Sequence, residues 1–236
     1  MYDRCVTAGC SGPAGVRTPC GQYHRAVPGS EPTVAPRRIG LLGGTFDPPH
    51  LGHAAAVLEA RRSLALDLVV LVVANDPWQK TADARIGNVD VVSPAEVRLA
   101  MTRAAVVGMD GVHVDDLEIR RGGPSHTAET LAHYTYVHPG AELFLLLGSD
   151  IAPDLDTWVR PDEVRRRATI VVMQRPGFEE GRPPIGWEHQ VLDGSFPDLA
   201  SNHLRDRFAA TGQPDGAVSA GVAEIIRAHG LYGVGR

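Results

Sequence analysis

Short apolar runs alternate with segments of helical pattern along most of the chain. The runs at 39–42, 67–74, 113–119, 142–148 and 169–174 are rich in β-branched and other apolar residues, as expected of buried strands. Helical patterns follow over 53–60, 93–107, the end of 123–138 and 219–233. This order predicts an α/β, Rossmann-like, doubly wound and mostly parallel sheet flanked by helices, with a small C-terminal helical part.

Polar and special residues indicate where the helices begin and end. Ser93 is the expected N-cap of its helix, with Pro94 at the first helical position and Glu96 completing a capping box. Asp47 and Pro48 are expected to start the helix after the first strand, and Gly230 to end the last one. Segment 177–190 reads as a loop over the surface.

Composition narrows the class of protein. The 236 residues are 43% hydrophobic and 22% charged, with a net charge of −5, so nothing draws the chain generally to nucleic acid. No apolar run approaches the roughly 20 residues of a membrane span, and no signal-peptide core precedes the fold. We expect a cytoplasmic protein with small-molecule ligands, no nucleic-acid or membrane partner, and a homo-oligomer left open.

The first 36 residues differ from the rest. Cys5, Cys10, Cys20 and His24 lie in a segment crowded with Gly, Pro, Ser and Thr. Three Cys and one His are enough for a zinc site, but their spacing matches none of the usual close Cys pairs. We favour a disordered leader over 1–36, because such a composition buries too little apolar surface to order itself. The folded domain is then 37–236.

The stretch GGTFDPPHLGH joins the first strand to its helix. Gly43 and Gly44 allow a sharp turn and close approach to a ligand, and turns of this kind hold phosphates in α/β proteins. His50 and His53 are three residues apart at the start of the helix, and so share one face. One histidine capping and the other packing is the plain alternative. Two imidazoles at this spacing in a Gly-rich turn favour stabilisation of charge on a phosphate.

The same stretch resembles the G-x-F-D-P-x-H-x-G-H signature of nucleotidyltransferases. Further segments resemble those of bacterial nicotinate mononucleotide adenylyltransferases, in the same order from about Arg38 to Tyr232. These are PWQK (77–80), RGGPSHTAETL (121–131, His126 replacing the usual Tyr), LLGSD (146–150), DTWVRPDEV (156–164), QRPGF (174–178) and the final GLYG. The second signature, I-S-S-T-x-x-R, corresponds to LASNHLR, where Ser201 and Arg205 match but Ala200 and Asn202 replace Ser and Thr.

The resemblance implies transfer of the adenylyl group of ATP to nicotinate mononucleotide, giving nicotinate adenine dinucleotide and pyrophosphate. It implies His50 and His53 as catalytic residues and magnesium bound with ATP rather than by protein ligands. The implied ATP-binding residues are Gly43, Gly44, Thr45, Phe46, His50, His53, Ser201, Asn202 and Arg205. The implied acceptor-binding residues are Lys80, Thr127, Asp150 and Trp158.

Several of these residues have plainer interpretations. Lys80 is an ordinary solvated lysine outside this context, Trp158 a core residue, and Asp150 a helix cap. Two alternatives for function also stand beside the main one. The first is the same transfer to another acceptor: nicotinamide mononucleotide, or a pantetheine or sugar phosphate. The second is a non-catalytic nucleotide-binding paralogue, disfavoured by the two intact histidines.

Overall fold

A six-stranded parallel sheet forms the centre of the described chain. The computed structural model describes residues 35–77, 92–175, 177–194, 197 and 199–235. The strands run in the order β3-β2-β1-β4-β5-β6, and every pair is parallel. Their bounds are β1 Arg38–Gly44, β2 Leu68–Val73, β3 Val112–Asp115, β4 Glu142–Gly148, β5 Thr169–Met173 and β6 His189–Leu192. This order confirms the predicted Rossmann-like fold, and the direction of winding reverses between β1 and β4.

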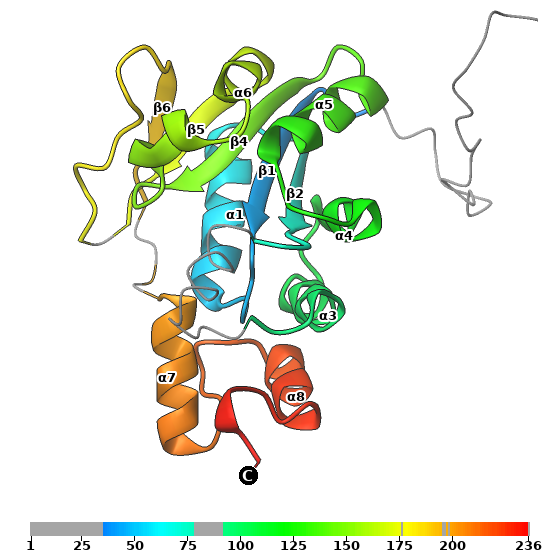
Figure 1. Cartoon of the computed structure of the whole chain (residues 1–236), viewed down its shortest axis with the longest axis vertical. Helices are drawn as coiled ribbons and strands as arrows, with labels where there is room; N and C mark the ends of the chain where they lie inside the picture. The colour runs from blue at the N-terminus through cyan, green and yellow to red at the C-terminus, as the bar shows by residue number, and fades with distance from the viewer. Residues whose placement is uncertain (1–34, 78–91, 176, 195–196, 198, 236) are drawn as a thin grey trace, which may run out of the picture. The chain divides into compact units, whose positions relative to one another are not determined.

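Helices cover both faces of this sheet (Figure 1). Along β4, Leu143, Leu145 and Leu147 face one side while Phe144 and Leu146 face the other, the period of two expected of a strand. The first side packs against α4 Leu117–Arg121, α5 Thr127–Val137, α6 Pro161–Arg167 and the 3₁₀ helix η1 Ala152–Thr157. The second packs against α1 Leu51–Ser63 and α3 Ala95–Ala105.

A third cluster joins the C-terminal helices to α3. It contains Met101 of α3, together with residues of α7 (Ser201–Thr211), α8 (Ala220–Ala228) and the segment that includes η2 (Leu231–Gly233). In Figure 1, α3 lies between the sheet and α8, with α7 beside them. The predicted C-terminal helical part is therefore confirmed, and it packs against α3, one of the helices on the second side of the sheet. No helix in the described part is both long and apolar enough to cross a membrane.

Two of the expected element types were wrong. The segment 113–119 is not one strand, because β3 ends at Asp115, whose carboxylate accepts the Leu117 N–H at 2.9 Å and starts α4. Segment 177–190 is more than a surface loop. Trp187 is buried in the core with its indole N–H donating to Asp156 at 2.7 Å, and β6 follows at His189. Apolar content alone revealed neither the local Asp115–Leu117 contact nor the tertiary contact of Trp187.

The predicted N-caps of α1 and α3, Asp47 and Ser93, were also wrong. The N-cap of α3 is Pro94, and the Ser93 N–H donates to the Asp47 carboxylate at 3.0 Å. The Asp47 carboxylate thus bonds to a distant segment instead of capping a helix. The N-cap of α1 is His50, three residues after the predicted cap. The last helix is shorter than predicted, but Gly230 follows it in the left-handed conformation that the sequence suggested.

A buried guanidinium ties these elements together. Arg98 of α3 is 1% exposed, and its guanidinium donates to backbone carbonyls of three different segments. The acceptors lie after β1 (Thr45, 2.9 Å), after β2 (Ala74, 2.7 Å, and Asn75, 3.0 Å) and before α3 (Ser93, 2.8 Å). Burial lowers the pKa of Arg98, yet an arginine remains charged. One side chain therefore fixes the carboxyl ends of two neighbouring strands.

Replacing this guanidinium should destabilise the fold more than a surface arginine does. Arg98→Met leaves these carbonyls without their donor, and each buried unsatisfied group costs about 1–3 kcal/mol. We expect a loss of at least about 3 kcal/mol in the free energy of unfolding, measured in urea. Arg103→Met on the same helix removes a half-exposed ion pair with Asp116 and should cost under about 1 kcal/mol. Equal losses in the two variants would contradict this account.

Candidate active site

The two histidines of the signature lie together at the start of α1. His50 is the N-cap and His53 the third helical residue, and their rings stack with centroids 3.8 Å apart. The His50 backbone N–H donates to Nδ1 of His53 at 3.2 Å. A neutral His53 then carries its proton on Nε2, where it serves as a donor. Phe46 contacts His53 edge to face at 5.1 Å. The predicted pairing of the imidazoles is present.

Two glycines of the signature differ in the space around them. A Cβ on Gly52 would lie 2.9 Å from Nδ1 of His50, so only glycine leaves room for that ring. A Cβ on Gly43 would lie more than 4 Å from every atom of the described residues other than its own chain neighbours. The packing of the described residues therefore requires a glycine at 52 and leaves space at 43, near the end of β1. This space fits the predicted approach of a ligand to the backbone.

His50 is held uncharged. It is buried, and desolvation together with the nearby positive charge of Arg175 lowers its pKa to about 4. Arg175 follows β5 and pairs with Asp150, which follows β4. The second Asp150 oxygen is buried without a hydrogen-bond partner among the described residues. Asp150 does not cap a helix, because Ile151 is the N-cap of η1.

The second signature, at the start of α7, contacts the turn between β1 and α1 that carries the first signature. Ser201 donates through its hydroxyl to the Pro48 carbonyl at 2.9 Å, and Arg205 donates to the Asp47 carbonyl at 3.0 Å. Ala200 is the N-cap of α7 and supplies no side-chain acceptor to the first N–H groups of the helix. Asn202 is exposed in the first turn. The two segments that the motifs assigned to ATP thus meet, although Ser201 and Pro48 are 153 positions apart in the chain.

The segments assigned to the acceptor meet at the end of β2. The Asn75 N–H donates to the Ser125 hydroxyl at 2.9 Å, and Asp76 forms a parallel bridge with Pro124. Thr127 is the first residue of the following helix, α5, and is partly buried. Arg98 connects this side to the histidine turn through its bonds to Thr45 and Asn75. Lys80 lies outside the described residues.

Trp158 has features of both interpretations given for it. It is partly buried and packs against the core, yet its indole N–H is buried without a hydrogen-bond partner among the described residues. Arg160, two residues on, has the left-handed φ of +56° and pairs with Glu129 of α5 at 2.9 Å. The Trp158 segment is thereby held against the helix that begins with Thr127.

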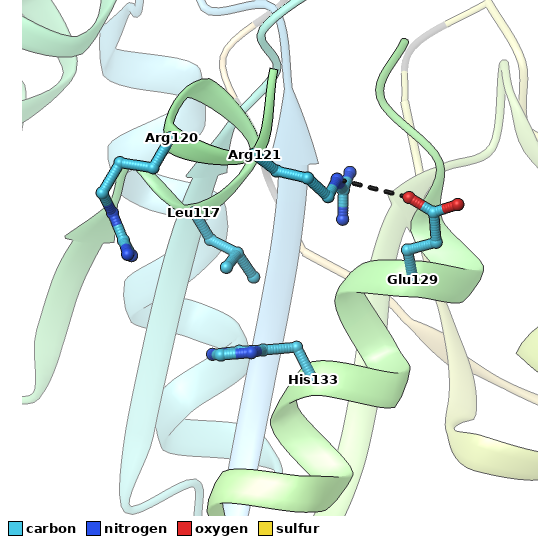
Figure 2. Close-up of a pocket in the computed structure, with 5 residues that line it drawn as sticks. All are labelled: Leu117, Arg120, Arg121, Glu129 and His133. Atoms are coloured by element: carbon cyan, nitrogen blue, oxygen red, sulfur yellow. Dashed lines mark ion pairs between the residues drawn. The ribbon is translucent and has the colours of Figure 1, made fainter. Parts of the chain in front are cut away.

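A separate pocket of about 420 Å³ opens between α4 and α5 (Figure 2). It is lined by Leu117, Arg120, Arg121, Glu129 and His133. Its guanidinium groups are paired: Arg121 with Glu129 at 3.3 Å, and Arg120 with two aspartates. Paired charges offer little to a phosphate, which favours the histidine turn over this pocket as the candidate active site. Among the described residues, no group of three His, Cys, Asp or Glu is placed to bind a metal.

Sequence reasoning missed several residues of this site. Arg98, Arg175 and Tyr232 received no role, although the last two lie in quoted motifs. Arg98 lies in α3, which packs against the sheet on one side and the C-terminal helices on the other. The spacing of apolar residues in this helix therefore does not indicate that Arg98 is buried. The contacts of the other two with Asp150 and Asp47 join distant segments. Only the folded chain reveals them.

Comparisons with known proteins agree with this geometry. A family model described as cytidylyltransferase-like matches residues 41–213. A probable nicotinate-nucleotide adenylyltransferase of Saccharopolyspora erythraea is 34% identical over 202 residues, covering 83% of this chain and 90% of the relative. Another, of Thermus thermophilus, is 36% identical over 197 residues, covering 83% and 99%. The chain belongs to the nicotinate-nucleotide adenylyltransferase family. The enzyme class predicted from its motifs, a nucleotidyltransferase of NAD biosynthesis, is thereby confirmed.

A solved structure supports the fold. The Plasmodium falciparum nicotinic acid mononucleotide adenylyltransferase complexed with NaAD has a TM-score of 0.66 and 18% identity, covering 84% of this chain and 98% of that one. At that identity the likeness concerns the backbone alone.

The uncharged state of His50 should make stability sensitive to acid. The folded pKa is about 4 and that of an unfolded histidine about 6.5, so the unfolded chain binds more protons between these values. The contribution of His50 to the free energy of unfolding is therefore fully present above pH 6.5 and is lost as the pH falls toward 4. Between pH 7 and pH 5 this single group should cost about 2 kcal/mol.

Urea unfolding at the two pH values measures this loss. His50→Asn should lose about 2 kcal/mol less than the unsubstituted protein over the same interval. His203→Asn, at an exposed position of α7, is the matched control and should follow the unsubstituted protein. An unchanged pH dependence in His50→Asn would show that His50 is not desolvated in the folded state.

Proposed function

We propose that this member of the family joins the adenylyl group of ATP to nicotinate mononucleotide by direct displacement, with His50 and His53 at the reacting phosphate. An oxygen of the mononucleotide phosphate attacks the α-phosphorus of ATP. The bond from the α-phosphorus to the bridging oxygen breaks, and pyrophosphate leaves. The products are nicotinate adenine dinucleotide and pyrophosphate. Little covalent work falls to the protein in such a transfer, so its contribution is positioning and stabilisation of charge.

The observation that carries this proposal is the stacked pair His50–His53 on a turn that the second signature, at the start of α7, contacts directly. Ser201 and Arg205 contact the carbonyls of Pro48 and Asp47, so a triphosphate beside α7 lies close to the imidazoles. The N-terminus of α7, without a side-chain cap, suits the outer phosphates. The guanidinium of Arg205 adds a positive charge beside the same phosphates.

The uncharged state of His50 indicates how the pair would act. His50, with a pKa of about 4, is neutral at neutral pH and would stabilise the phosphate as a hydrogen-bond donor, not as a permanent cation. The backbone bond to Nδ1 leaves the proton of a neutral His53 on Nε2. The rings would then stabilise most strongly the charge that develops as pyrophosphate leaves.

The acceptor and the metal complete the proposal. We assign the acceptor to Lys80, Thr127 and Trp158. We assign the ribose hydroxyls to the Asp150 oxygen that has no hydrogen-bond partner in the described part of the chain. Magnesium would enter with ATP, bound by phosphate oxygens and water, the hard ligands that it prefers. A cytoplasmic location remains a prediction from the sequence, which leaves a homo-oligomer open.

Pyrophosphate release tests the acceptor. We expect release with ATP and nicotinate mononucleotide to exceed that with nicotinamide mononucleotide or with a pantetheine or sugar phosphate. Faster release with one of the others would replace the proposed acceptor. A protein that binds ATP and releases pyrophosphate with none of them would be the non-catalytic paralogue.

Replacing either histidine should lower kcat much more than it weakens ATP binding. Loss of one preorganised donor to a developing charge costs about 10²–10³ in rate. His50→Ala and His53→Ala are compared by steady-state turnover, ATP titration and thermal unfolding. His138→Ala, at the far end of α5, is the control and should keep its kcat. Near-normal kcat in a folded His53→Ala protein would end this mechanism.

Replacing an acceptor residue should affect the mononucleotide and spare ATP. Lys80→Ala removes the cation assigned to the acceptor phosphate, and Trp158→Ala the ring assigned to stack on the base. We expect each to raise KM for nicotinate mononucleotide roughly tenfold, the value of about 1.4 kcal/mol of binding, with KM for ATP within about twofold. Because Trp158 also packs against the core, thermal unfolding is recorded alongside. An effect confined to ATP would reverse the assignment of the two halves of the site.

A further inference from the structure

The signature turn is held by a residue near the C-terminal end of the described chain. Asp47, in the middle of the turn, is 3% exposed, and its carboxylate accepts the Tyr232 hydroxyl at 2.5 Å. The two residues are 185 positions apart. The other carboxylate oxygen accepts the Ser93 N–H at 3.0 Å. A buried carboxylate inside a turn is costly unless such donors satisfy it, so the position of Asp47 depends on both.

Other contacts from the C-terminal part reach the same turn. The Leu51 N–H, at the start of α1, donates to the Ala217 carbonyl at 2.9 Å. The Ser201 and Arg205 contacts with the turn carbonyls lie beside it. Tyr232 differs from Ser201 and Arg205 because no part of the proposed reaction requires it to touch substrate. Its role must be sought in the protein itself.

Both ends of the Tyr232–Asp47 contact show backbone strain. Phe46, next to Asp47, has φ +51°, and Tyr232 has φ +54°, a left-handed conformation that is unfavourable for a non-glycine residue. Such residues persist where the surrounding structure holds them. Phe46 in turn contacts the His53 ring. A displacement of the turn at Asp47 would therefore reach the imidazoles through one residue.

The phenol of Tyr232 is suited to this task. Burial and the Asp47 carboxylate raise its pKa well above the ordinary value, so it remains a donor at all physiological pH. Its ring lies 6.4 Å from that of Phe208, among the apolar side chains of the C-terminal cluster. Ring packing and hydroxyl donation are thus separable, and Tyr232→Phe removes only the second.

We propose that Tyr232 is a positioning residue of the active site: its hydroxyl, through Asp47, fixes the turn that presents His50 and His53 to the reacting phosphate. The proposal rests on the function proposed above. It makes a C-terminal residue outside both signatures part of the catalytic apparatus.

Tyr232→Phe should lower kcat roughly ten- to a hundredfold, the cost of misplacing reacting groups by about 1 Å. KM for nicotinate mononucleotide should stay within about twofold, because the proposed acceptor residues Thr127 and Trp158 lie on elements that pack on the other face of the sheet. The matched control is Tyr134→Phe, which also removes a buried tyrosine hydroxyl bound to an aspartate, Asp115, at 2.6 Å. Tyr134→Phe should lower Tm and leave kcat unchanged. Rates are measured where circular dichroism shows each variant folded.

A double-mutant cycle with Asp47→Asn tests the route of the effect. If Tyr232 acts through Asp47, then Tyr232→Phe should lower kcat less than about twofold in the Asp47→Asn background. Unchanged kcat in the single variant Tyr232→Phe, an equal loss in Tyr134→Phe, or full additivity in the cycle would overturn the proposal.

A second readout separates this proposal from the proposed function. The imidazole NMR signals of His50 and His53, assigned by single replacement, should shift in Tyr232→Phe and stay in place in Tyr134→Phe. If the unsubstituted protein shows no turnover, the proposed function fails, and these signals alone decide the positioning role. Signals that Tyr232→Phe leaves unmoved overturn it.

Discussion

The turn between β1 and α1 must bury irregular backbone and still satisfy its polar groups. Regular strands and helices satisfy their own carbonyls, but a turn inside a packed protein depends on other segments. Here the donors come from Arg98, Ser201, Arg205 and Tyr232. Each lies on an element that packs on the sheet or on α3. The geometry of the histidines is therefore a consequence of the packing of the whole described unit.

This arrangement also sets the electrostatics. Arg98 is directed at carbonyls, and Arg175 at Asp150, so both of these cations are held in fixed positions. Burial beside Arg175 keeps His50 neutral in the free protein. Under the proposed function, the hydrogen-bond donors are set in place before the phosphates bind, so little reorganisation is needed as charge develops. A neutral His50 also avoids the repulsion that two stacked imidazolium ions would suffer.

The reversal of winding between β1 and β4 brings together the segments that the proposal assigns to the two substrates. The turn after β1 bears the histidines, and the end of β4 bears Asp150. The end of β2 contacts the segment before Thr127. Parallel strands bring these carboxyl ends to one edge of the sheet. The paired guanidinium groups of the α4–α5 pocket, by contrast, bind segments of the protein to one another: Glu129 joins Arg121 to Arg160.

The sequence by itself determined the fold class, five of the six described strands in whole or part, and the pairing of His50 with His53. Those features are local: apolar runs, glycines in a turn and a three-residue spacing on a helix. It did not determine the role of Asp47, the burial of Arg98 and Trp187, the strand β6 or the contact of Tyr232 with the turn. A carboxylate or guanidinium looks the same in a sequence whether it is solvated or buried. Its partners, far along the chain, are chosen only when the sheet and its layers pack.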